Sequence, residues 1–229
     1  MQMRVPLTKF GWPQVVLLPA GVLAAMLVCL LAAPLWLGAW AVYALAAMLA
    51  AVFVWVLAFF RDPERAVPSD RNVLLAPADG KIIGVEEVQE DEFIGAKALR
   101  ITIFLSIFDV HINRAPCSVT VEKITYRPGK FKNAMNPESA RVNESNDLWL
   151  TRTDRPNDKL IVRQISGAIA RRIVWTAKPG QSLTAGERFG MIKFGSGTEI
   201  YLPAGNNAKC LVKVGDKVKA GLSAVVRYE

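Results

Sequence analysis

The feature that most constrains this chain is a long segment near its N-terminus that carries no charged side chain. Residues 15–60 contain no Asp, Glu, Lys or Arg, which is a run of 46 residues. A helix needs only about 20 apolar residues to cross a bilayer, so the segment predicts two crossings with a turn at Pro34 and Gly38. A cleaved signal peptide is the rival interpretation, but such a peptide has only a short apolar core. We therefore expect residues 1–60 to form a membrane anchor with two transmembrane helices.

Positive charge flanks this apolar segment at both ends. Arg4 and Lys9 precede it, and three arginines follow it, beginning with Arg61. Because segments rich in Lys and Arg stay on the cytoplasmic side of a membrane, both ends of the hairpin are predicted to lie in the cytoplasm. The rest of the chain, residues 61–229, is then expected to be a cytoplasmic domain at the cell's inner (plasma) membrane.

The composition agrees with a membrane-associated protein. The net charge is +8, yet no nucleic-acid motif accompanies it, so we interpret the charge as attraction to an anionic membrane surface and expect no nucleic-acid partner. The three cysteines, Cys29, Cys117 and Cys210, are too widely spaced for a disulfide framework or a metal-ligand motif. We therefore expect a reducing environment and no metal site.

Residues 61–229 carry the pattern of a mainly β (α+β) domain. Residues 99–105 alternate apolar and polar side chains with period two, as a half-buried strand does. Further strand candidates are residues 81–85, 119–126, 147–152, 160–164 and 173–176. Residues 166–172 are a candidate short helix. The polar, Asn-rich residues 130–146 predict a long loop that could fold over a site.

One internal repeat is visible. Residues 180–186 match residues 215–221 in pattern, and each segment begins and ends with glycine and precedes a strand-like run. This hairpin is similar to the one in lipoyl and biotinyl carrier domains, which are compact β-sandwiches. The repeat therefore strengthens the mainly β prediction.

A serine between two glycines, Gly195-Ser196-Gly197, is the first candidate for chemistry. Its hydroxyl could attack a substrate, or it could attack its own backbone at the carbonyl of Gly195, which lacks a Cβ and tolerates strained dihedrals. Gly-Ser-Gly is also ordinary turn chemistry. The motif therefore needs support from elsewhere in the chain.

Acid–base candidates are few. His111 is the single histidine of the protein, so imidazole proton transfer near neutral pH must use it. Asp109, two positions earlier, would point to the same side in an extended strand. Asp79 lies in a Pro-Ala-Asp-Gly turn, where it could equally bond its own backbone. Ser196, His111 and an aspartate could form a nucleophile, a base and an orienting group, but no Gly-x-Ser-x-Gly motif of a serine hydrolase is present.

Four ordered segments together resemble the phosphatidylserine decarboxylase family in its short bacterial form. They are Phe59-Phe60-Arg61-Asp62-Pro63-Glu64-Arg65, Ala76-Pro77-Ala78-Asp79-Gly80-Lys81, Phe108-Asp109-Val110-His111-Ile112-Asn113-Arg114-Ala115-Pro116 and Phe194-Gly195-Ser196-Gly197. The likeness runs from about residue 59 to the C-terminus.

The resemblance implies a self-processing enzyme that uses a pyruvoyl group derived from Ser196. The Ser196 hydroxyl would attack the Gly195 carbonyl, and β-elimination would then break the chain. The products would be a β chain, residues 1–195, and an α chain, residues 196–229, which stay associated. His111 would be the base, oriented by Asp79.

The resemblance also implies the reaction. The amine of phosphatidylserine would form a Schiff base with the pyruvoyl group, CO2 would leave, and phosphatidylethanolamine would be released. His111 is again the candidate proton donor. The anchor suits a substrate that stays in the bilayer. A homo-oligomer is compatible with the sequence.

One departure concerns the histidines. Many relatives carry a second histidine three residues after the first, where this chain has Arg114. His111 would then serve both self-cleavage and turnover, or Asp109 or another group takes one task. The Leu-Gly-Ser-Thr form common in relatives is also changed here, because Phe194 and Gly197 flank the retained Gly195-Ser196 pair. Candidates for binding the substrate phosphate are the cations Arg114, Arg171, Arg172 and Lys193.

Two alternatives remain open from the sequence. The first is a membrane-tethered carrier or binding module built on the lipoyl-like hairpins, although no attachment lysine motif lies between the repeats. The second keeps the decarboxylase chemistry but acts on an ether-linked serine phospholipid.

Overall fold

The computed structural model describes residues 7–32, 34, 37–132, 139–168, 172–193, 196–205 and 207–229. The chain divides into two compact units, Met1–Pro63 and Glu64–Glu229. Each unit has its own architecture and is described by itself.

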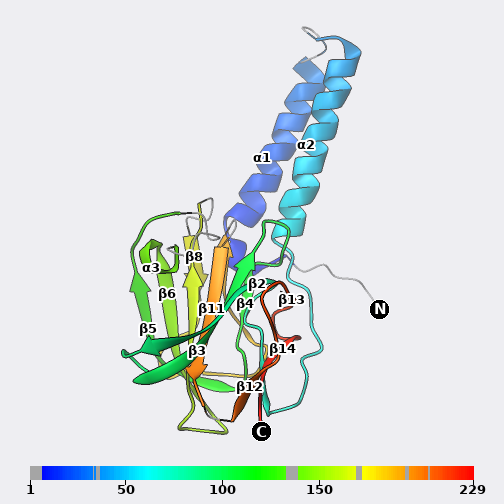
Figure 1. Ribbon diagram of the computed structural model, residues 1–229. Helices are drawn as coiled ribbons and strands as arrows, with labels where there is room; N and C mark the ends of the chain where they lie inside the picture. Colours follow the sequence, from blue (N-terminus) through cyan, green and yellow to red (C-terminus); the bar gives the residue numbers. More distant parts are fainter. Residues whose placement is uncertain are drawn as a thin grey trace. The chain divides into compact units, whose positions relative to one another are not determined.

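The first unit is a pair of apolar helices, α1 (Gln14–Ala32) and α2 (Ala39–Phe59), preceded by a short 3-10 helix, η1 (Lys9–Gly11) (Figure 1). The two helices pack against each other. The chain enters and leaves at the same end, since Leu7 forms a bridge with Arg61 and the Thr8 amide donates to the Phe60 carbonyl at 2.9 Å. Both helices are long and apolar enough to cross a membrane. The predicted helical pair is confirmed, whereas its passage through a bilayer stays a prediction.

The second unit is built on one large antiparallel sheet, with strand order β13-β2-β3-β11-β7-β6-β5-β9 among the described residues (Figure 1). Its strands are β2 (Gly80–Glu90), β3 (Ala96–Leu105), β5 (Val119–Arg127), β6 (Ser145–Arg152), β7 (Lys159–Ile165), β9 (Ser182–Leu183), β11 (Ser196–Pro203) and β13 (Lys217–Val218). Strand β11, which comes late in the chain, pairs with β3 on one side and β7 on the other. The C-terminal segment is therefore inserted into the middle of a sheet made mostly of earlier strands.

Two smaller sheets complete the described part of this unit, with orders β1-β14-β12 and β4-β10-β8. Their strands are β1 (Val73–Leu75), β4 (Ile112–Arg114), β8 (Arg172–Trp175), β10 (Arg188–Lys193), β12 (Ala208–Cys210) and β14 (Ala224–Tyr228), and a short helix, α3 (Ser139–Val142), precedes β6. The predicted mainly β domain preceded by two helices is confirmed. The likeness to lipoyl domains stays a prediction.

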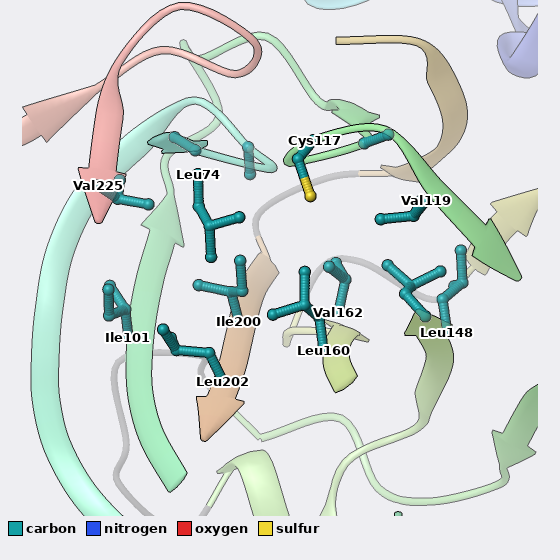
Figure 2. Packing of buried hydrophobic residues seen from close by; sticks show 14 of the residues in the cluster. Leu74, Ile101, Cys117, Val119, Leu148, Leu160, Val162, Ile200, Leu202 and Val225 are labelled. Carbon is teal, nitrogen blue, oxygen red and sulfur yellow. The ribbon is translucent and has the colours of Figure 1, made fainter. Parts of the chain in front are cut away.

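The inner face of the large sheet forms the apolar core. Along β11, Ile200 and Leu202 enter this core, whereas Glu199 and Tyr201 point to the opposite face, as the period of a strand requires. Figure 2 shows Ile200 among apolar side chains of β3, β7 and β1, namely Ile101, Leu160, Val162 and Leu74. Burial of these side chains is the main source of stability for the unit.

The outer face of the sheet carries charged pairs. The Arg163 Nε and Nη2 atoms donate to the two Asp147 oxygens at 2.6 and 2.8 Å, and Arg127 contacts the same carboxylate. The Glu199 carboxylate is buried beside Arg163 and accepts from the Tyr201 hydroxyl. Burial alone would lower the pKa of Arg163, but the hydrogen bonds to Asp147 raise it overall. The guanidinium therefore stays charged beneath this face.

The sequence repeat is also a structural repeat. The Gly180 amide donates to the Val121 carbonyl and the Gly215 amide to the Ile82 carbonyl, at 2.7 and 2.9 Å. At the other end of each segment, Gly186 and Gly221 have φ values of 75° and 70°, a conformation that favours glycine. Each repeat thus joins its hairpin to an earlier strand by equivalent hydrogen bonds.

Two local expectations were wrong in part. Residues 166–168 of the expected short helix are irregular, Arg172 already belongs to β8, and residues 169–171 lie outside the described part of the chain. Residues 130–146 are not a continuous loop, because they contain α3 and the start of β6, while residues 133–138 are not described. Tertiary pairing extended β6 and β8 beyond their sequence signal.

Truncating a core residue of β11 tests this packing. We expect Ile200→Ala to lower the free energy of unfolding by about 2–5 kcal/mol, because it leaves a cavity in a fully buried site. Urea unfolding of the full chain in detergent micelles measures the change. Val214→Ala, at a side chain that is 61% exposed, is the control and should change stability by less than about 0.5 kcal/mol. Equal effects of the two substitutions would contradict this description of the core.

Candidate active site

The turn after β3 carries His111. Asp109 closes this turn, since its Oδ2 atom accepts from the Ser106 amide at 2.8 Å and its own amide donates to the Ser106 carbonyl at 2.9 Å. His111 is fully buried, and its Nδ1 atom lies 3.0 Å from the Asp109 carbonyl oxygen. Because a carbonyl can only accept, Nδ1 carries the proton and Nε2 presents the lone pair in the neutral ring. The imidazole is thus oriented by backbone, and Nε2 is the nitrogen suited to act as a base.

Ser196 begins β11 where β3 ends. It pairs with Leu105, the last residue of β3, and is fully buried. Its Oγ atom has no hydrogen-bond partner in the described part of the chain, although buried hydroxyls nearly always have one. Phe194 and Gly195 lie outside the described residues, so the cleavage predicted between Gly195 and Ser196 stays a prediction. A buried hydroxyl without a hydrogen-bond partner is nevertheless suited to attack a neighbouring carbonyl carbon.

Asp79 is bound to a cation rather than to the imidazole. Its Oδ1 and Oδ2 atoms accept from the two terminal nitrogens of Arg65 at 2.6 and 2.8 Å, and Oδ1 also accepts from the Ala220 amide at 2.8 Å. A bidentate, mostly buried arginine pair of this kind is strong and directional. These contacts give Asp79 a structural task, and its predicted role as partner of His111 stays a prediction.

A buried amide network lies beneath Ser196. Asn113 of β4 donates through Nδ2 to the Thr198 hydroxyl at 3.1 Å and accepts from Gln164 Nε2 at 2.9 Å. Gln164 in turn accepts from Asn146 at 3.0 Å. The network joins β4, β11, β7 and β6 within the buried interior. It fixes the position of β11 two residues after Ser196.

A second row of polar groups lies beside this network at the end of the sheet. The Ser166 amide donates to the Glu144 carbonyl at 2.9 Å, and Asn143 Nδ2 donates to the Ser166 carbonyl at 2.8 Å. The Oε1 atom of Glu144 accepts from the Tyr126 hydroxyl at 2.9 Å, and this hydrogen bond raises the pKa of Tyr126. No sequence motif singles out Ser166, and the sequence indicates Asn143 and Glu144 only as possible substrate contacts within the polar residues 130–146.

The candidate phosphate-binding cations separate into three groups. Arg172 and Lys193 are opposite each other on β8 and β10, and burial, then the charge of Arg172, lowers the pKa of Lys193. Arg114 is buried between the two repeat turns, where its Nη1 atom donates to the Gly186 carbonyl at 3.1 Å. Arg171 lies outside the described residues. Phosphate binding by these residues stays a prediction.

The chain also has a cavity of about 540 Å³ that none of the predicted site residues line. Cys117 lies at its wall, and burial raises the pKa of this thiol to about 12. Such a thiol stays protonated and unreactive at neutral pH. In the described part of the chain, no group of three or more His, Cys, Asp or Glu side chains converges to hold a metal ion.

Comparison with known proteins identifies the family. The family model for phosphatidylserine decarboxylase matches residues 52–226. A phosphatidylserine decarboxylase proenzyme of Symbiobacterium thermophilum is 42% identical over 98% of this chain and 97% of its own length. Proteins with the same name from Nitrosomonas europaea and Desulfotalea psychrophila are 42% and 46% identical over 97% and 73% of this chain, and over 95% and 76% of their own lengths. The chain belongs to the phosphatidylserine decarboxylase family.

The predicted family and enzyme class, a decarboxylase, are thereby confirmed. The match begins inside α2 and ends in β14, so it covers all but the last three residues of the β-rich unit of this decarboxylase. Both halves of the candidate site, the His111 turn and Ser196, lie within it. This result favours the enzyme over the carrier module.

The pairing of Arg65 with Asp79 yields a stability prediction for the decarboxylase. We expect Arg65→Ala to lower the free energy of unfolding by about 3 kcal/mol, because it leaves a buried carboxylate without its cation. A double-mutant cycle with Asp79→Ala, followed by urea unfolding of the full chain in micelles, measures the coupling.

Arg188→Ala is the matched control. Arg188 pairs with Glu64, whose side chain is 80% exposed, so its loss should lower stability by less than about 1 kcal/mol. If Arg65→Ala is no more destabilising than Arg188→Ala, the structural role of the Arg65–Asp79 pair is wrong.

Proposed function

We propose that this protein decarboxylates phosphatidylserine to phosphatidylethanolamine and CO2, with a pyruvoyl group made from Ser196 by self-cleavage after Gly195. The observation that carries the proposal is the buried Ser196 hydroxyl without a partner among the described residues. The related proteins are named proenzymes of this decarboxylase, which agrees with processing of a precursor.

Self-cleavage follows from ordinary acyl chemistry at Ser196. Its Oγ atom loses a proton and attacks the Gly195 carbonyl carbon, and the peptide nitrogen of Ser196 leaves with a proton, which converts the amide into an ester. Removal of the Ser196 Cα proton then expels the Gly195 carboxylate from Cβ. The resulting dehydroalanine tautomerises to an imine, and water hydrolyses it to a ketone and ammonia. The chain ends at Gly195, and the new chain begins with the pyruvoyl group.

The buried position suits this group. Ser196 is fully buried, so the ketone formed there would be protected from bulk water. Its two neighbours in the sequence, Gly195 and Gly197, carry no side chain that could cover it. When present, the pyruvoyl ketone condenses with the substrate amine and accepts the electron pair that CO2 leaves behind. His111 would then deliver the proton to the α-carbon of the product, from a ring held by the Asp109 carbonyl.

The two processed chains would remain together. The α chain, residues 196–229, contributes β11, and this strand pairs with β3 and β7 of the β chain. It also contributes β14, which pairs with β1. Release of the α chain would break ladders in two sheets and expose core residues such as Ile200 and Val226, so cleavage changes the covalent structure and leaves the fold intact.

The membrane assignment follows the same proposal. The two apolar helices would anchor the enzyme with both ends in the cytoplasm, at the inner membrane that holds its lipid substrate. Arg172 and Lys193, together with Arg114 and Arg171, are the proposed partners of the substrate phosphate. Without the membrane anchor, the phospholipid substrate would have to leave the bilayer to reach the active site.

Substitution of Ser196 tests the proposed function. The wild-type chain should give fragments of roughly 21 and 4 kDa, whereas Ser196→Ala should remain a single inactive chain, because alanine supplies no nucleophile. Intact-mass spectrometry detects the cleavage and the loss of ammonia. Release of CO2 from ester-linked and ether-linked phosphatidylserine measures the activity and the lipid preference. A mature active protein with an intact bond between residues 195 and 196 would refute the mechanism.

A further inference from the structure

Three inward-facing residues form a row across the end of the large sheet. Antiparallel pairing joins Ser145 to Ile165 and Ile165 to Gly197. Extending both pairings by one residue places Glu144 opposite Ser166 and Ser166 opposite Ser196, and the hydrogen bond from the Ser166 amide to the Glu144 carbonyl supports the first of these.

The side chains of this row share the inner face. Thr198 and Gln164, two positions away from Ser196 and Ser166, both bond to buried Asn113, and side chains two apart on a strand lie on the same face. Cβ atoms of directly opposed residues are about 5 Å apart. Ser166 therefore stands between Glu144 and Ser196 in this row, although no hydrogen bond joins the three side chains in the structure.

Each member of the row has an unused oxygen. Ser196 and Ser166 are fully buried, Glu144 is 7% exposed, and Ser196 Oγ, Ser166 Oγ and Glu144 Oε2 have no hydrogen-bond partner in the described part of the chain. An unpaired buried polar atom costs about 1–3 kcal/mol. Three such atoms in one row, one of them on the nucleophile, indicate a chemical task rather than a structural one.

The other carboxylates near the site are engaged. Asp79 is held by Arg65 and the Ala220 amide. Asp109 is held by the Ser106 amide within its own turn. Glu144 uses only Oε1, as the acceptor from Tyr126. Of these three carboxylates, Glu144 is the one with a buried oxygen, Oε2, that has no hydrogen-bond partner in the described part of the chain.

We propose that Glu144, acting through the Ser166 hydroxyl, is the general base that activates Ser196 for self-cleavage. The inference rests on the proposed function and assigns to Glu144 the task that a single imidazole would otherwise share with turnover. His111 then serves the decarboxylation step. In this proposal a small side-chain rotation brings the Ser166 hydroxyl to Ser196, and Glu144 acts through it.

Protons balance along this relay. Ser196 Oγ passes its proton to Ser166 Oγ, which passes its own proton to Glu144 Oε2 while Ser196 Oγ forms the bond to the Gly195 carbonyl carbon. When the bond between that carbon and the Ser196 nitrogen breaks, Ser166 Oγ donates its proton to the nitrogen and regains one from Glu144 Oε2. Glu144 ends ionised, and the acyl shift involves no net gain or loss of protons.

Glu144→Gln and Ser166→Ala test the relay. The full chain is synthesised in a cell-free system with lipid nanodiscs, and intact mass follows the appearance of the chain that begins at residue 196. We expect Glu144→Gln to slow self-cleavage by about 100-fold, the usual contribution of a general base, and Ser166→Ala to slow it in the same direction. CO2 release per pyruvoyl-bearing chain, measured after prolonged processing, should stay within about threefold of wild type, because His111 is intact.

Glu199→Gln is the matched control. Glu199 is also a buried carboxylate that accepts from a tyrosine hydroxyl, but it lies on the outer face of β11. Its self-cleavage rate should equal that of the wild type. Removal of the unpaired Ser166 hydroxyl should leave the thermal unfolding temperature unchanged or raise it, which separates a chemical role from a structural one.

The outcomes are distinguishable. Wild-type rates of self-cleavage in both Glu144→Gln and Ser166→Ala would overturn the relay and leave the proposed function standing. Equal losses of self-cleavage and of turnover per pyruvoyl, with a lowered unfolding temperature, would also overturn it in favour of a structural role. If the wild-type chain itself does not cleave after Gly195, the proposed function fails and the relay fails with it.

Discussion

The pairing of β11 with β3 and β7 is the constraint on which the rest of the structure depends. Its ladders fix which residues of β11 face inwards, so Ile200 fills the core while Ser196 points into the polar end of the same face. A register shift of one residue would reverse both assignments. The hydrogen bonds of Asn113 to Thr198 and Gln164 reinforce this register from a different sheet. One strand thus couples the stability of the domain to the position of Ser196.

The buried polar groups of this domain differ in whether they have a hydrogen-bond or ion-pair partner. Most are paired, as the free energy of desolvation requires, and the Arg65–Asp79 pair and the Asn113 network are examples. A minority are unpaired, and three of these atoms, the hydroxyl of Ser196 among them, belong to the row at the end of the inner face. Proteins tolerate such groups where chemistry needs them, which agrees with the decarboxylase family to which the chain belongs.

The two hairpin repeats provide the frame around this site. Their turns anchor equivalent strands through Gly186 and Gly221, and Arg114 fills the space between these two turns. Asp79 reaches the second repeat through the Ala220 amide. Arg114 is therefore part of the packing of the repeats.

The sequence by itself determined the two apolar helices, most strands, the repeat, His111 and Ser196 as candidates, and the family, because these signals are local: hydropathy, alternation, turn residues and short motifs. It did not reveal that Arg65 binds Asp79, that Asp109 caps its own turn, or that Glu144 and Ser166 lie in a row with Ser196. The last of these relations depends on which residues stand opposite each other across β6, β7 and β11. Strand register is set by the packing of the whole inner face, and only the tertiary structure decides it.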